Sequence, residues 1–96
     1  MDIYDVFRNM AYFWGNDIIP YFTDLVKIKN VNVRSMVAAS LGIIGTKDAL
    51  KLCKTFLLDE DWVVQQDAVH SYNEIKGTNY HHKELLRMVK DGTLLA

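Results

Sequence analysis

The sequence predicts an all-α fold: a solenoid of about three stacked helix pairs, with six helices. Apolar residues recur every three or four positions along most of the chain, which is the period of an amphipathic helix. The chain also matches itself when shifted by 31 positions, so that Val6 falls on Val37 and Ala68, and Met10 falls on Leu41 and Tyr72. A repeat of this length indicates helix pairs that bury their apolar faces only by stacking on their neighbours.

The periodic stretches are separated by residues that break helices, and they predict helices at 2–14, 17–29, 32–44, 47–58, 62–76 and 80–91. Gly15 separates the first helix from the second, and Pro20 stands early in the second, where a missing N–H costs little. Gly45 and Gly77 can take the left-handed conformation that ends the third and fifth helices. The acidic run 59–61 precedes the fifth helix, where carboxylates offset unpaired N–H groups.

The second helix of each pair follows the same register. Asp17 falls on Asp48 and Phe22 on Cys53, and one extra residue near Gly77 brings Leu85 onto that second column. The fourth and sixth helices are predicted on this basis. The whole chain is expected to form one domain, residues 1–96, with units of about 1–31, 32–62 and 63–96.

Composition limits the classes of function. Eleven basic and twelve acidic residues leave a net charge of −1, whereas proteins that grip nucleic acid or anionic membranes normally carry a basic excess. Lysines do gather at 27, 29, 47, 51 and 54, but acidic residues balance them. The first residues lack the pattern of a signal peptide and no window is apolar enough to span a bilayer, so a cytoplasmic location is expected. Cys53, the only cysteine, is interpreted as a small core residue.

The stretch Val33–Gly45, VRSMVAASLGIIG, resembles the short-period HEAT repeat of phycobilisome lyase-like proteins, whose motif runs V-R-x-x-A-A-x-A-L-G-x-I-G. Residues 64–75 keep the apolar spacing but carry Gln65 in place of the arginine, and residues 2–14 are the most divergent copy. The resemblance implies a right-handed α-solenoid. It also implies that Arg34 bonds acceptors in an adjacent turn, with ligand contact as the alternative.

In such a solenoid, the motif positions that are not structurally fixed point into a concave groove. The residues at these positions are Tyr4, Asp5, Arg8, Tyr12, Ser35, Met36, Ala39, Ile43, Gln66, Asp67, His70 and Glu74. Exposed Met and Tyr are common partner-binding residues. For Met36 and Ile43 two interpretations stay open, because both could instead pack against neighbouring helices as core.

The first helix has apolar residues nearly all the way round, namely Ile3, Tyr4, Val6, Phe7, Met10, Tyr12, Phe13 and Trp14. A terminal repeat normally presents a polar outer face that caps the stack. This end is therefore expected to be covered, either by a second copy in a homodimer or by a partner.

No pattern of residues demands a particular chemistry. Asp67, His70 and Glu74 share a helical face, but helical zinc motifs use two histidines four apart, so we expect no metal. His81 and His82 are interpreted as surface at the start of the last helix, and Trp14 and Trp62 as core. We expect no catalytic residues and no cofactor.

The leading hypothesis is an adaptor or regulatory module that binds a protein through its groove or its apolar end. One alternative is a lyase-like or chaperone-like accessory subunit for chromophore-bearing proteins, which the family motif permits. A nucleic-acid-binding HEAT-like protein is the other alternative, which the balanced charge disfavours.

Overall fold

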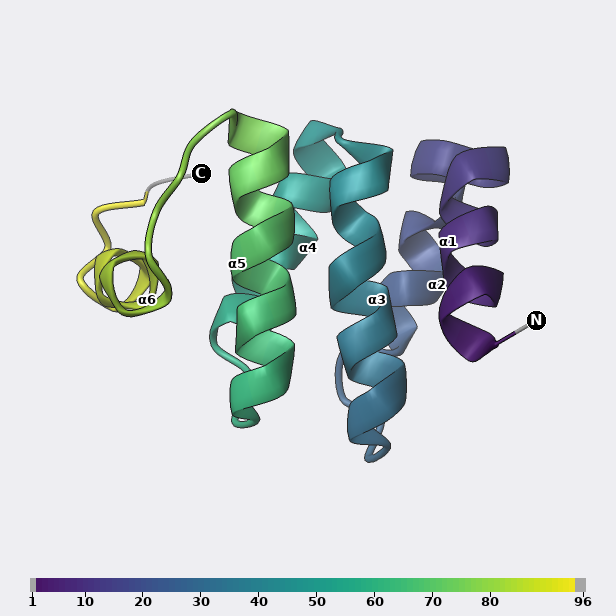
Figure 1. The fold of residues 1–96 in the computed structure, drawn as a ribbon, viewed down its shortest axis with the longest axis horizontal. Coiled ribbons are helices and arrows are strands. Elements are labelled where there is room, and N and C mark those ends of the chain that lie inside the picture. Colours follow the sequence, from purple (N-terminus) through teal and green to yellow (C-terminus); the bar gives the residue numbers. More distant parts are fainter. Residues whose placement is uncertain (1, 95–96) are drawn as a thin grey trace.

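The computed structural model describes residues 2–94, and within them it contains helices and turns but no strand (Figure 1). The all-α class is therefore confirmed. In chain order the elements are α1 (Ile3–Trp14), the 3-10 turn η1 (Gly15–Ile18), α2 (Ile19–Asp24), α3 (Val31–Ile44), α4 (Lys47–Leu57), α5 (Trp62–Lys76) and α6 (His82–Lys90).

Polar side chains cap the starts of the longer helices. Asp2, Asn30, Thr46 and Asp61 each accept a hydrogen bond from a backbone N–H in the first turn of α1, α3, α4 and α5 respectively. At the other end, α3 and α5 stop at glycines with φ of 69° and 67°, a conformation that a side chain would strain. These local signals explain why the predicted bounds of α3, α4 and α5 agree with the structure to within about a residue.

The predicted helix at 17–29 is wrong in detail, because regular α-helix covers only Ile19–Asp24. Pro20 has no N–H to donate, and the preceding residues tighten into η1, where the Ile19 N–H donates to the carbonyl of Asn16. After Asp24 the chain continues in turns, with the N–H of Leu25 donating to the carbonyl of Phe22. The second helix of the first unit is therefore shorter than its counterpart α4.

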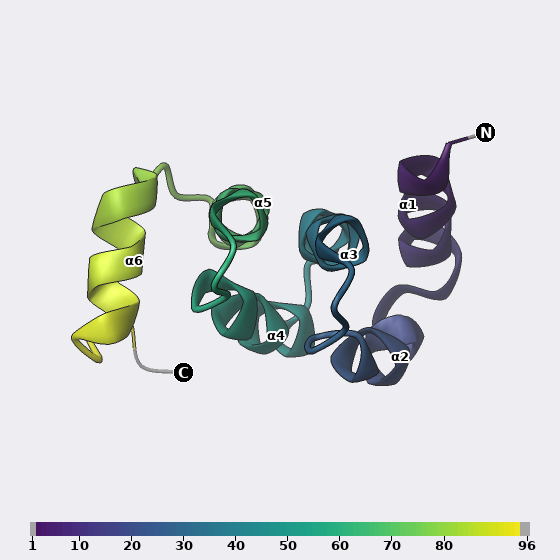
Figure 2. The same ribbon diagram turned by 90° about the horizontal axis from the view of Figure 1, so that it is seen from below.

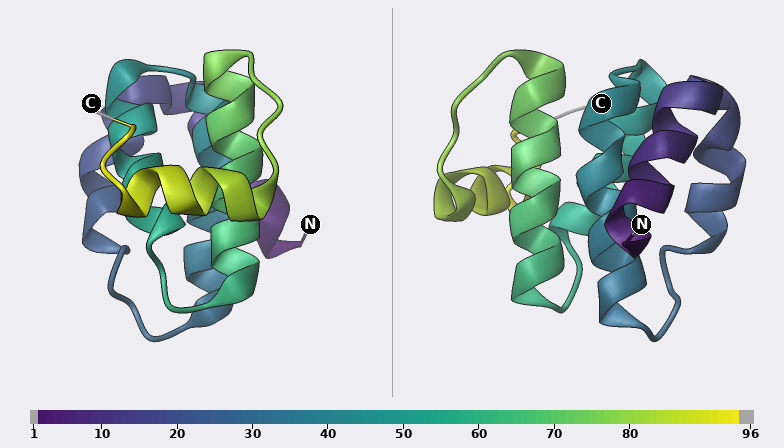
Figure 3. Two further views of the ribbon diagram at one scale, coloured as in Figure 1. Left: turned by 90° about the vertical axis from the view of Figure 1, so that its left-hand side faces the viewer. Right: turned by 45° about the vertical axis from the view of Figure 1, so that its right-hand side comes forward.

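The helices form two rows. Figure 2 shows α1, α3 and α5 side by side in one row, with α2 and α4 in the other. The last helix departs from this arrangement: α6 runs across the end of the stack and packs against both α4 and α5 (Figure 3). The third pair is thus less regular than the first two.

The core lies between the rows and consists mainly of Phe22, Val37, Leu41, Cys53, Phe56, Leu57, Val64, Ala68, Tyr72 and Leu85. The interpretation of Cys53 as core is confirmed, and burial raises the pKa of its thiol to about 12. Residues in one repeat column differ by layer: Val37 and Ala68 are fully buried, whereas Val6 is 41% exposed. The difference arises because the described chain has no layer before α1.

Candidate functional site

A groove of about 410 Å³ runs over the row of first helices. Its lining residues are Tyr4, Arg8 and Tyr12 from α1, Met36, Ala39, Ser40 and Ile43 from α3, and His70 and Glu74 from α5. The structure thus brings together most of the positions that the repeat motif left unassigned. Three successive layers contribute to one surface, because residues at matching columns point the same way.

Small residues let α3 and α5 approach each other beneath this groove. A Cβ on Gly42 would lie 3.3 Å from the Cα of Ser71 and 2.8 Å from a carboxylate oxygen of Glu74. The Ser71 hydroxyl donates to the carbonyl of Ala38 at 2.6 Å, which closes the seam with a buried polar contact. The backbones of α3 and α5 are therefore closely packed beneath the groove.

The two walls of the groove differ in chemistry. On α1, Arg8 lies 3.7 Å from Asp5, and its side chain is 56% exposed. On α5, His70 Nε2 lies 3.0 Å from Glu74, and both side chains are at least half exposed. Exposed pairs of this kind stabilise a fold very little, so these charged groups stay available to a ligand.

Met36 and Ile43 were the two groove positions with an alternative interpretation as core. Met36 is 1% exposed, and Ile43 is half-buried. Both nevertheless border the groove beside Ala39. Met36 therefore serves mainly as core while its surface forms part of the groove floor.

Four residues expected in the groove do not line it, namely Asp5, Ser35, Gln66 and Asp67. Asp67 faces α3 and accepts a hydrogen bond from the Ser35 hydroxyl. Burial raises the pKa of the Asp67 carboxyl, an effect that the Ser35 hydrogen bond and the nearby His70 oppose. Gln66 turns instead toward His82, whose Nδ1 lies 3.4 Å from its amide nitrogen. Both side chains connect neighbouring helices and leave the groove shorter than expected.

Arg34 is buried and joins two inter-helix turns. Its Nε and Nη2 donate to the two carboxylate oxygens of Asp59, at 2.9 and 3.2 Å. Its Nη1 donates to the carbonyls of Ile28 and Lys29, at 2.6 and 3.2 Å. The hydrogen bond to Asp59 is the main reason why the pKa of Arg34 is raised. With these acceptors the guanidinium links the turn after α2 to the turn after α4.

His82 and the tryptophans correct the sequence analysis. His82, expected at the surface, is only 9% exposed. Its Nε2 lies 3.0 Å from Oε1 of the Gln65 side chain, and its ring lies edge-on to Trp62. Burial lowers the pKa of the His82 imidazole, and the neighbouring His81 and Lys83 lower it further. Trp14 and Trp62, expected in the core, are 56% and 62% exposed. Trp14 is the last residue of α1, and Trp62 is the first residue of α5.

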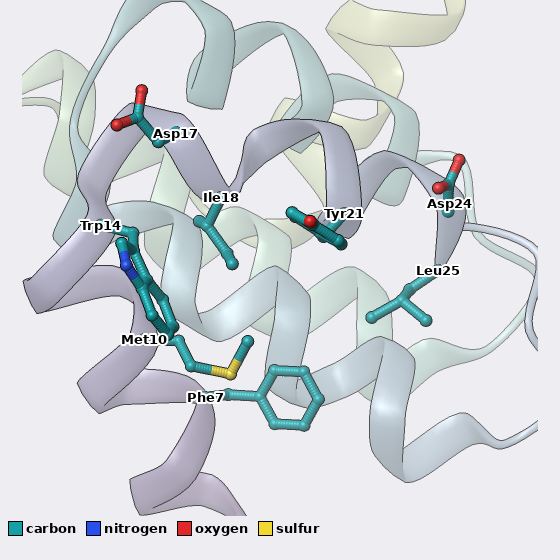
Figure 4. A pocket seen from close by; sticks show the side chains of 8 residues that line it. All are labelled: Phe7, Met10, Trp14, Asp17, Ile18, Tyr21, Asp24 and Leu25. Atoms are coloured by element: carbon teal, nitrogen blue, oxygen red, sulfur yellow. The ribbon is translucent and has the colours of Figure 1, made fainter.

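A second and larger cavity, of about 720 Å³, lies at the N-terminal end (Figure 4). Its lining residues are Phe7, Met10, Trp14, Asp17, Ile18, Tyr21, Asp24 and Leu25. Sequence analysis identified the apolar residues of α1 but missed those of η1 and α2. The signal was present in the repeat, because Tyr21 and Leu25 stand on the columns of Leu52 and Phe56, which are buried one layer further on.

Among residues 2–94, no group of three or more His, Cys, Asp or Glu side chains is arranged to hold a metal ion. In the same part of the chain, no helix is both long and apolar enough to cross a membrane.

Comparison with known proteins gives one match. A family model described as HEAT repeats matches residues 6–73, which is most of the chain. No curated protein and no solved structure matches the chain.

Proposed function

Because the chain belongs to the family of HEAT repeat proteins, we propose that it is a protein-binding module that acts as an adaptor or regulator and not as an enzyme. Solenoids of stacked repeats typically bind their partners on an extended concave surface. The observation that carries the proposal is the groove over α1, α3 and α5, because it is assembled from the variable positions of three repeats.

The chemistry of the groove favours a polypeptide ligand. Tyr4, Arg8 and Tyr12 form one wall, and tyrosine and arginine are enriched among the residues that dominate binding energy at protein interfaces. His70 and Glu74 on the opposite wall can accept or donate hydrogen bonds to a backbone or to a basic side chain. A nucleic acid is disfavoured, because the carboxylate of Glu74 would face its phosphates.

The finer architecture belongs to the same proposal. Residues 1–96 form one right-handed stack with units of about 1–31, 32–62 and 63–96, and the protein works in the cytoplasm. The apolar N-terminal end is a second contact surface, separate from the groove because the two cavities have no lining residue in common.

A matched pair of exposed tyrosines tests the groove. Tyr12, in the groove, is 70% exposed, and Tyr21, outside it, is 68% exposed, so neither alanine substitution should disturb folding. Proteins captured from the source cell by the wild-type chain would be purified and titrated against each variant. For a protein that binds in the groove, we expect Tyr12→Ala to weaken binding at least tenfold, or by about 1.4 kcal/mol. Tyr21→Ala should leave that binding unchanged, because Tyr21 lines the N-terminal cavity instead.

Two results would contradict the proposal. One is that the wild-type chain captures no protein. The other is that every captured protein binds the Tyr12→Ala variant, folded by circular dichroism, as tightly as it binds the wild type.

A further inference from the structure

The N-terminal cavity is apolar inside and acidic at its ends. Phe7, Met10, Trp14, Ile18, Tyr21 and Leu25 surround it, and Figure 4 shows the carboxylates of Asp17 and Asp24 at opposite ends of the η1–α2 segment. Neither carboxylate forms an ion pair within residues 2–94. The cavity therefore combines apolar surface with two negative charges that have no ionic partner in that part of the chain.

The repeat shows that this surface is an unfilled stacking face. Tyr21 is 68% exposed, whereas Leu52 on the same column of the next unit is 7% exposed. Leu52 shares a crevice with Ile19 and Thr23, which belong to α2 of the preceding layer. The residues of α4 are thus covered by a helix from the layer before, and the equivalent residues of α2 are not.

The covered seam also shows what kind of element fits. There, Asn16 of the first layer donates its amide N–H to a carboxylate oxygen of Asp48 at 2.9 Å. Asp17 occupies the column of Asp48, but no side chain among residues 2–94 donates a hydrogen bond to it in this way. The element that would complete the seam at the N-terminal end is therefore a helix that has an apolar stripe with hydrogen-bond donors beside it.

From this geometry we propose that the N-terminal cavity binds an amphipathic helix of a partner protein, whose apolar stripe is flanked by lysine or arginine. This inference rests on the proposed protein-binding function and names the occupant of its second surface. The apolar stripe packs on Met10, Ile18 and Leu25, and the basic residues pair with Asp17 and Asp24. Trp14 and Tyr21 add aromatic faces on which a guanidinium can stack.

The charges favour a partner over a second copy. In a twofold dimer through this end, the same patch meets itself, so the interface gathers four carboxylates and the cavity lining supplies no basic residue to pair with them. Like charges across an interface oppose association, whereas a basic helix neutralises them. A homodimer through α1 is thus an alternative outcome that the experiment must detect.

Two synthetic helical peptides test the occupant directly. Both carry the same leucine stripe at positions i, i+3, i+4 and i+7; one is flanked by lysines and the other by glutamates. Fluorescence anisotropy with labelled peptides would measure their binding to the full chain. We expect the lysine-flanked peptide to bind at least tenfold more tightly than the glutamate-flanked one, and Asp17→Lys combined with Asp24→Lys to reverse that preference.

The tyrosine pair separates this surface from the groove. Tyr21→Ala should weaken binding of the lysine-flanked peptide at least tenfold, and Tyr12→Ala should leave it unchanged. Equal binding of both peptides, or no binding, overturns the proposal even where Tyr12→Ala still disrupts a groove partner. A dimer by light scattering that Tyr21→Ala dissociates also overturns it, because the occupant is then a second copy.

Discussion

At the scale of single residues, Arg34 connects more of the molecule than any other side chain described above. Its guanidinium holds a carboxylate from one turn and two backbone carbonyls from another, and the side chains of Arg34 and Asp59 are only 7% and 8% exposed. A planar guanidinium can form all these hydrogen bonds at once, whereas an ammonium cannot reproduce the paired contact with Asp59.

We therefore expect Arg34→Met to lower the free energy of unfolding by about 3 kcal/mol, because it removes the charged partner of the buried Asp59 carboxylate and leaves it the backbone N–H of Asp61 as a donor. Arg34→Lys should cost less than Arg34→Met but more than a surface substitution. Urea unfolding followed by circular dichroism measures both.

Arg8→Met is the control. Arg8 is 56% exposed and pairs with Asp5, so its loss should cost less than about 0.5 kcal/mol. Equal costs at the two arginines would refute this role.

At the scale of elements, α6 is the helix most loosely tied to the repeat. It runs across the end of the stack and packs against α4 and α5 (Figure 3). His82 at its start is held between Gln65 and Gln66 of α5, with Trp62 beside it. With Gln66 donating to Nδ1 and Nε2 donating to Gln65, the ring is held in its neutral form. A proton on Nδ1 would remove the acceptor that Gln66 uses.

This arrangement predicts acid sensitivity. Because burial lowers the pKa of His82 in the folded state, the unfolded chain takes up the proton first as the pH falls. The contribution of His82 to stability is therefore present above about pH 6.5, the usual value for histidine, and is lost as the pH falls below it. We expect His82→Gln to shrink the drop in Tm between pH 7.5 and pH 5.0. His70→Gln, at a position 72% exposed, should keep the full drop.

If His82→Gln and the wild type lose the same number of degrees between the two pH values, His82 does not control the packing of α6. If His82→Gln only lowers the Tm at pH 7.5, the result would indicate no more than the packing of the ring against Trp62. The difference between the two pH values is therefore the decisive measurement.

The elements also show how far the sequence can predict this molecule. The ends of α3 and α5 follow from Gly45 and Gly77, and the α1 and α3 side of the groove follows from the repeat columns, because both depend on residues close in the chain. The environment of His82 could not be predicted, since it depends on the angle at which α6 crosses α5. No periodicity within a helix encodes that angle.

Asp67 illustrates a similar limit on the other side of the groove. Asp67 lies on the same face of α5 as His70 and Glu74. The close approach of α3 to α5 at Gly42 nevertheless places it against Ser35. Whether a polar residue at the edge of a helical face meets a neighbour or solvent depends on an interhelical distance, which side-chain spacing alone does not fix.

At the scale of the whole molecule, burial in a repeat column depends on how many layers cover it. Val37 lies in the middle of the stack and is fully buried, whereas Val6 stands on the same column of the first layer and is 41% exposed. In a stack of repeats each unit is stabilised by its neighbours, so a terminal unit has fewer contacts to lose. Identical substitutions at equivalent positions should therefore differ in cost.

We predict that Val37→Ala lowers the free energy of unfolding by about 2 kcal/mol, from two buried methyl groups and the cavity left behind. Val6→Ala should cost about 1 kcal/mol or less, because its side chain is already partly in water and alanine favours the helix. Urea unfolding of both variants gives the comparison. Equal costs for the two valines would contradict the dependence of burial on layer that their exposures indicate.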